Sequence, residues 1–123
     1  MEEWEIRITD HCLAWVEALD EGSKAEVVDA IDRLAEAGPG LGRPLMDRLE
    51  GSQVHNLKEL RPGSAGRSEV RIVFAFDPWR SAILLIGGDK SGDWSGWYGR
   101  TIPLAEELYA EYLKEREAEE AAQ

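Results

Sequence analysis

The chain is poor in the residues that mark several large protein classes. Its single cysteine, Cys12, cannot form an intrachain disulfide, which favours a reducing, cytoplasmic setting. Only two histidines occur, His11 and His55, and neither has a cysteine or carboxylate at a spacing typical of metal ligands. We therefore expect no metal and no other cofactor, and we interpret Cys12 as a small core residue.

Long apolar runs and an excess of positive charge are also missing. No stretch approaches the roughly 20 apolar residues of a membrane span, and the first twenty residues lack the basic segment of a signal peptide. A net charge of -11 argues against sequence-independent binding to DNA. A length of 123 residues with 43% hydrophobic content predicts a single domain over residues 1–123.

Positive charge is nevertheless concentrated in one part of the chain. Residues 1–50 carry a net charge of -8 and residues 101–123 a net charge of -5, whereas residues 51–100 carry +2. The middle segment also holds three of the five tryptophans, Trp79, Trp94 and Trp97. Cations interleaved with aromatic rings are typical of proteins that bind single-stranded nucleic acid.

Hydrophobic periodicity predicts the order strand, two helices, three strands, helix. Alternation over residues 4–8 predicts a first strand, and Thr9 or Asp10 caps a helix that ends near Leu19. The pattern of Ser23 and Glu26 predicts a capping box for a second helix, which ends at Gly38. Residues 38–52 are expected to form a loop with a short turn.

The second half of the chain predicts an antiparallel meander with strands over residues 54–61, 70–76 and 82–86. Residues 87–99 are expected to form a glycine-rich loop, and Pro103 begins a final helix. The tail, residues 115–123, lacks an apolar anchor and is expected to fray. The predicted fold class is α+β, a small antiparallel sheet with the helices packed on one face.

Strand parity places Glu59, Arg61 and Arg71 on the sheet face opposite the predicted core. Such a face can be a plain solvated surface with cross-strand ion pairs, and it can equally be a phosphate-binding site. Lys90 and the aromatic side chains of the next loop favour the second interpretation. The glycine-rich run from Gly87 to Gly92 lacks the spacing of a Walker motif, so we reject a nucleotide-binding loop.

Four sequence strings together resemble the RelE/HigB toxin family, most closely its phage-derived, actinobacterial-type branch. The resemblance extends from about Leu41 to Leu113. The strings are Leu57-Lys58-Glu59-Leu60-Arg61, Arg71-Ile72-Val73-Phe74-Ala75-Phe76-Asp77, the segment from Leu84 to Tyr98 with Gly87-Gly88-Asp89-Lys90-Ser91-Gly92, and Ile102-Pro103-Leu104-Ala105.

The resemblance implies a RelE-like fold and a metal-independent endoribonuclease that cleaves mRNA on the ribosome and inhibits translation. It also implies a helix-turn-helix antitoxin of the HigA kind as partner. The implied catalytic residues are Glu59, Arg61, Arg71, Lys90 and Tyr98. The implied RNA-binding residues are Lys58, Arg67, Trp97 and Arg100. Core packing under the last helix is an equal alternative for Trp97.

An alternative function comes from cations that this chain lacks. Where relatives of this family carry basic residues near the tryptophans, the chain has Ser95, Gly96 and Gly99. Fewer phosphate contacts weaken binding to RNA. The alternative is therefore a toxin-like module with weak or no catalysis, which acts by binding an antitoxin or another protein.

Overall fold

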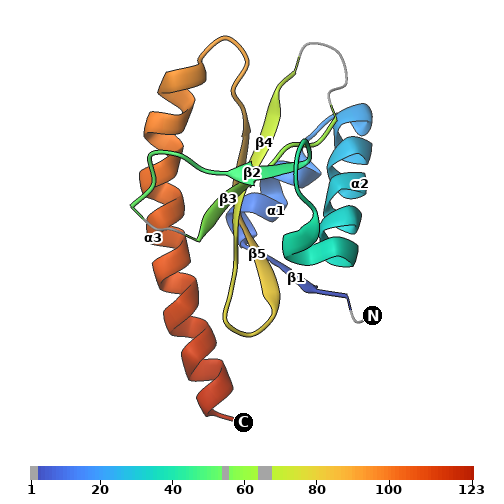
Figure 1. Ribbon diagram of the computed structural model, residues 1–123. Helices are drawn as coiled ribbons and strands as arrows, with labels where there is room; N and C mark the ends of the chain where they lie inside the picture. Colours follow the sequence, from blue (N-terminus) through green and yellow to red (C-terminus); the bar gives the residue numbers. More distant parts are fainter. Residues whose placement is uncertain (1–2, 54–55, 64–67) are drawn as a thin grey trace.

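A computed structural model describes residues 3–53, 56–63 and 68–123 (Figure 1). The elements are β1 (Glu5–Ile8), α1 (Asp10–Glu17), α2 (Glu21–Ala37), η1 (Gly38–Gly40), β2 (Met46–Arg48), β3 (Leu57–Leu60), β4 (Val70–Phe76), β5 (Ser81–Asp89) and α3 (Trp94–Ala121). The predicted α+β class is confirmed. None of the helices in the described ranges is long and apolar enough to cross a bilayer.

The five strands form one sheet in the order β1-β5-β4-β3-β2. The predicted meander is confirmed, because β3, β4 and β5 pair antiparallel with their sequence neighbours. The prediction of an all-antiparallel sheet is wrong, because β1 pairs parallel with β5. Most of the chain separates these two strands, so no tight turn imposes an antiparallel direction on them.

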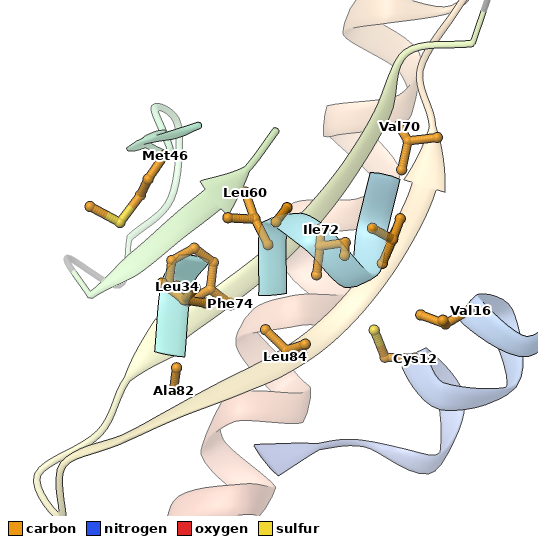
Figure 2. Close-up of a cluster of buried hydrophobic side chains, with 12 residues drawn as sticks. Cys12, Val16, Leu34, Met46, Leu60, Val70, Ile72, Phe74, Ala82 and Leu84 are labelled. Atoms are coloured by element: carbon orange, nitrogen blue, oxygen red, sulfur yellow. The ribbon is translucent and has the colours of Figure 1, made fainter. Parts of the chain in front are cut away.

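The helices cover both faces of the sheet, which corrects the expectation that they pack on one face. Helices α1 and α2 pack on the face that carries Leu60, Ile72 and Phe74 (Figure 2). Helix α3 packs on the opposite face, over Val73 and Ala75 (Figure 1). Strand β4 is apolar on both sides, so each side needs a cover to keep it from water.

The first helix begins as predicted, and the second begins earlier than predicted. Thr9 accepts a hydrogen bond from the Cys12 amide and caps α1. Asp20 accepts a bond from the Ser23 amide at 3.1 Å, so Asp20 caps α2 and the predicted capping box is wrong. Val27, Ala30 and Leu34 are buried on α2, whereas Val28 is exposed.

The segment expected to be a loop over residues 38–52 contains the edge strand β2. Met46 of β2 pairs with Leu60 and is buried with the α2 side of the core. A run of only three strand residues beside glycine and proline gives no clear period of two. The pairing partner in β3, rather than local propensity, determines this strand.

Helix α3 is longer than predicted at both ends. It begins at Trp94 and contains Pro103 inside the helix, although a proline there removes one backbone donor. Its C-terminal part continues to Ala121 and does not have the frayed geometry expected for residues 115–123. Arg116 is buried, and Glu119 forms an ion pair with Arg7 at 3.0 Å. Charged contacts, rather than apolar ones, hold this end of the helix to the sheet.

Candidate active site

A buried carboxylate lies at the centre of the candidate site. Glu59, on β3, is 4% exposed and shares its face of the sheet with α3. Its Oε1 atom lies 3.2 Å from the Nε atoms of both Arg61 and Arg71. The Tyr98 hydroxyl lies 2.9 and 3.1 Å from the two oxygens of Glu59 and donates to them. Two cations and one hydroxyl donor therefore compensate the burial of this charge.

Strand pairing explains how distant parts of the sequence meet here. Glu59 and Arg61 are two residues apart, and side chains at this spacing lie on the same face of an extended chain. Leu60 pairs with Ile72, which places Arg71 beside Arg61 on the neighbouring strand. Tyr98 comes from the second turn of α3, which covers this face. The predicted grouping of Glu59, Arg61 and Arg71 is confirmed by these contacts.

Arg71 is held in place but is incompletely hydrogen bonded. Its Nη1 donates to the carbonyl oxygen of Val70 at 2.8 Å. Its Nε is buried and has no hydrogen-bond acceptor among the described residues, although Glu59 is close enough for an ion pair. Buried donors are rarely left unpaired in native proteins.

Lys90 lies at the end of β5 and is almost fully buried. Its Nζ atom is 3.2 Å from Glu69 Oε2 and 3.6 Å from the centre of the Trp94 ring. The same atom is 5.7 Å from the centre of the Tyr98 ring, so Lys90 adjoins the Glu59 cluster. A cation above aromatic rings is attracted by their negative faces, which adds to the ion pair with Glu69.

The five predicted catalytic residues line one open groove of about 1330 Å³. Arg61, Arg71 and Lys90 therefore meet in one concave surface. The groove also includes Arg43 and Arg48, two cations that strand parity around the meander did not indicate. They reach the groove because β2 extends the sheet beyond β3.

Carboxylates are nearly as numerous as cations in this groove. Its basic side chains are Arg43, Arg48, Arg61, Arg71 and Lys90, and its acidic side chains are Asp47, Glu50, Glu59 and Glu106. Asp47 pairs with Arg43 at 3.0 Å and with Arg61 at 3.3 Å. Several cations are thus already neutralised within the chain, and a ligand phosphate must compete with these carboxylates.

Three of the four predicted RNA-binding residues are described in the structure, and none of these three lines the groove. Lys58 pairs with Phe74 across the sheet and lies on the face of α1 and α2. Trp97 is buried in the core beneath α3. Arg100 is exposed, does not line the groove and forms an ion pair with Asp93 at 2.8 Å. Arg67 lies outside the described residues.

Trp94 is the exposed aromatic side chain that the sequence did not single out for the site. It is 63% exposed and lines the groove, whereas Trp97 is 8% exposed. Both belong to the first turn of α3, and only the direction of this helix decides which of them faces the core. Residues 87–99 were expected to form a loop, and a loop has no helical period that would distinguish the exposed Trp94 from the buried Trp97.

The Tyr98 hydroxyl in the site and the Cys12 thiol in the core both remain protonated near neutral pH. Burial, and then the hydrogen bond to the Glu59 carboxylate, raises the pKa of Tyr98 to about 12. Burial alone raises the pKa of Cys12 to about 12. Tyr98 can therefore donate a proton at neutral pH, and Cys12 is unsuited to act as a nucleophile.

The chemistry available to the groove is that of acids, bases and cations. Within the described ranges, no group of three or more histidine, cysteine, aspartate or glutamate side chains is arranged to hold a metal ion. A carboxylate between two guanidinium groups, a neutral phenol and an ammonium group suit the binding of a phosphate and proton transfer beside it.

We predict that Gly88→Ala destabilises the protein and disturbs the site. The Trp97 indole packs directly on Gly88, which pairs with Arg71 across the sheet, so an added Cβ collides with the ring. The expected loss is about 1–3 kcal/mol in the free energy of unfolding, measured with urea. Gly99→Ala is the matched control, because nothing lies within 4 Å of the added Cβ. An equal effect of the two substitutions would contradict the prediction.

Comparisons with known proteins agree with this architecture. The sequence profile of a family described as "Phage derived protein Gp49-like" matches residues 14–110. HigB2 of Mycobacterium tuberculosis is 53% identical over 104 residues, which cover 85% of this chain and 52% of HigB2. The chain thus matches about half the length of that relative. HigB3 of the same organism is 52% identical over 99 residues, which cover 80% of this chain and 84% of HigB3.

Three solved structures share the fold at low sequence identity. A mutant of the Escherichia coli toxin RelE in the free state gives a TM-score of 0.56 at 11% identity and covers 92% of this chain and 97% of its own. The toxin–antitoxin complex RelBE2 of Mycobacterium tuberculosis gives a TM-score of 0.54 at 16% identity and covers 71% of this chain and 98% of its own. The archaeal RelE–RelB complex of Pyrococcus horikoshii gives a TM-score of 0.53 at 13% identity and covers 73% of this chain and 98% of its own.

The family match covers most of the described fold, from α1 into α3. The relative HigB3 is more than half identical along most of its length. The resemblance read from the four sequence strings is confirmed. This chain belongs to the Gp49-like family of RelE/HigB-type proteins.

Proposed function

We propose that this chain is the toxin of a type II toxin–antitoxin pair and that it cleaves mRNA on the ribosome without a metal ion. The observation that carries the proposal is the meeting of Glu59, Arg61, Arg71 and Tyr98 in a groove that Lys90 also lines. The relatives HigB2 and HigB3 carry toxin names, which supports the same class for this chain.

The proposed reaction matches the groups that the cluster contains. The RNA's own 2′-hydroxyl attacks the adjacent phosphorus, and the 5′-oxygen leaves. One group must take the 2′-proton, another must protonate the leaving oxygen, and cations must balance the charge on the phosphate. The cluster contains a carboxylate, a neutral phenol and three cations, so each requirement has a candidate residue.

We assign proton acceptance to Glu59. Among the carboxylates that line the groove, it contacts both Arg71 and Tyr98. A scissile phosphate bound by Arg61 and Arg71 competes with Glu59 for these two cations. Binding of the phosphate then frees Glu59 Oε1 from its ion pairs and leaves it available to accept the 2′-proton. Substrate binding would thus prepare the base for the reaction.

The proton for the leaving 5′-oxygen comes from Tyr98 or Lys90, the two proton donors of the cluster beside the arginines. The raised pKa of Tyr98, about 12, keeps its hydroxyl protonated at neutral pH. Lys90 Nζ lies 3.6 Å from the centre of the Trp94 ring, so its ammonium group is held in a defined place. Holding these donors before the substrate arrives reduces the reorganisation needed in the transition state.

We further propose an antitoxin as the protein partner, with the helix-turn-helix architecture of the HigA kind. Two of the structural neighbours were solved as toxin–antitoxin complexes. The strongly acidic balance of this chain supports a partner with basic surface segments, because opposite charges accelerate and orient association. We expect the wild-type chain to purify as a complex when it is co-expressed with its helix-turn-helix antitoxin.

The proposal is tested by induction of the chain in a bacterial host. Wild type should stop growth and create new mRNA 5′ ends, whereas an Arg71→Ala, Lys90→Ala double variant should lower cleavage by at least about 10²-fold, because it removes two phosphate-binding cations. Lys24→Ala, Arg33→Ala is the matched control, since both residues lie on α2 outside the groove. A harmless, soluble wild-type protein would contradict the enzymatic proposal, as would equal toxicity of the double variant.

The near balance of charge in the groove favours one other candidate function. Four carboxylates accompany five cations there, which reduces the attraction for a polyanion. A toxin-like module that binds an antitoxin without cleaving RNA has no need of a strongly cationic groove. Stable capture of the antitoxin by a wild-type chain that leaves mRNA intact would support this second function.

A further inference from the structure

Glu69 is a carboxylate that the proposed reaction does not use and that touches two residues of the groove. It immediately precedes β4 and does not line the groove itself. Its Oε2 atom lies 3.2 Å from Lys90 Nζ and accepts a hydrogen bond of 3.2 Å from Trp94 Nε1. The side chain of Glu69 is 44% exposed, whereas that of Lys90 is 4% exposed. An accessible anion thus contacts a buried cation of the site.

The side chain of Glu69 is not what holds this part of the fold together. Its backbone amide donates to Asp89 Oδ1 at 3.0 Å, and its carbonyl oxygen accepts from the Lys90 amide at 3.1 Å. These two bonds join the start of β4 to the end of β5 and do not involve the Glu69 carboxylate. The carboxylate can therefore leave Lys90 and Trp94 while the backbone stays in place.

The carboxylate and a phosphate compete for the same donors. An ammonium group and an indole N–H placed around one oxygen atom suit an oxygen of either anion. Hydrogen bonds from Lys90 and then Trp94 lower the pKa of Glu69, so the carboxylate is charged at neutral pH. While it occupies Lys90, that cation carries little net attraction for RNA.

We propose that Glu69 is a built-in competitor for the phosphate subsite formed by Lys90 and Trp94, and that an RNA phosphate displaces its carboxylate on binding. The inference rests on the proposed function, because it requires RNA in the groove. In this proposal Glu69 does not take part in the reaction but weakens the affinity of the groove for RNA. Displacement also frees the Trp94 N–H to bond to the phosphate.

The test measures affinity for an RNA that cannot be cleaved. A short 2′-O-methyl RNA oligonucleotide lacks the attacking hydroxyl and is titrated into wild type, Glu69→Gln and Glu50→Gln. Glu69→Gln keeps the side-chain shape and removes the charge, and it should bind about three- to tenfold tighter. Glu50 lines the same groove and makes no ion pair within the described ranges, so Glu50→Gln controls for the general loss of one negative charge. Because Glu50 occupies no cation among the described residues, the affinity of Glu50→Gln should rise only by the general charge effect, by less than about twofold.

The indole N–H signal of Trp94 gives a second readout that a general charge effect does not change. Assigned with a Trp94→Phe variant, this NMR signal should shift in wild type as RNA is added, because the bond to Glu69 is replaced. In Glu69→Gln the free protein should already show a shifted signal. Glu50→Gln should follow wild type.

The possible outcomes separate this inference from the proposed function. If the RNA binds all three proteins and Glu69→Gln is no tighter than Glu50→Gln, the competitor role is wrong while the RNA-binding function stands. A Trp94 signal that does not move on saturation would contradict displacement. If the RNA binds none of the three proteins, displacement by an RNA phosphate is wrong, whereas the proposed function is decided separately by the induction assay.

Discussion

Glu59→Gln should lower the rate of mRNA cleavage by about 10²–10³-fold, the usual contribution of a general base. The substitution keeps the size of the side chain and its ability to accept the Tyr98 hydrogen bond. It removes the charge that pairs with Arg61 and Arg71 and the capacity to take the 2′-proton. The measurement is the rate of appearance of new mRNA 5′ ends in a translating extract.

The pH profile separates a base from a residue that only positions the arginines. A rate that depends on a carboxylate base falls as pH is lowered, because a protonated carboxyl group cannot accept the 2′-proton. If Glu59 is the base, the plot of rate against pH for Glu59→Gln should lack this acidic limb, the fall at low pH. If Glu59 only positions the arginines, the substitution should lower the rate and leave the shape of the plot unchanged. Glu50→Gln controls for charge in the groove and should stay within about threefold of wild type. Retention of the limb in Glu59→Gln would assign proton acceptance to another group.

Arg116→Ala should lower the free energy of unfolding by about 3 kcal/mol, because it removes the cation paired with the buried Asp77 carboxylate. Arg116 is 6% exposed, and its Nη1 lies 3.5 Å from Asp77 Oδ2. The same Nη1 donates to Ser81 Oγ at 3.2 Å and to the Tyr112 hydroxyl at 3.1 Å. The guanidinium therefore joins α3 to the turn between β4 and β5 and to the start of β5.

Urea unfolding followed by circular dichroism measures this loss. Arg33→Ala is the matched control, because Arg33 pairs with Asp29 on the exposed surface of α2. Such a pair contributes little, so the expected change is below about 0.5 kcal/mol. Equal stability of the two variants would show that Asp77 is satisfied without Arg116, through its backbone donors at Trp79 and Ser81.

The grouping of Glu59, Arg61 and Arg71 was predictable because it follows from the geometry of strands. Glu59 and Arg61 are two residues apart in a segment with strand character, so their common face follows from the geometry of an extended chain. Arg71 joins them through the pairing of adjacent strands in a meander, which is the shortest-range tertiary contact a sheet offers. The two-residue period of a strand therefore indicates, from the sequence, which side chains share a face of the sheet.

The assignment of the tryptophans was not predictable in the same way. Trp94 and Trp97 are three residues apart at the start of α3, and which of them is buried depends on the docking of that helix against β4 and β5. The local signals at residues 87–99 are glycines, which favour a loop and conceal the helix start. The contact of Trp97 with Gly88 explains the position of the ring, but only after the helix has been placed.

The sequence by itself determined the α+β class, the face shared by Glu59, Arg61 and Arg71, and the resemblance to the family, because strand parity and short motifs act over a few residues. The tertiary structure decided the remainder of the site. The contact of Glu69 with Lys90 and the exposure of Trp94 depend on strands and a helix that meet only in the folded chain. Side-chain contacts between elements have no period along the sequence, so packing alone selects them.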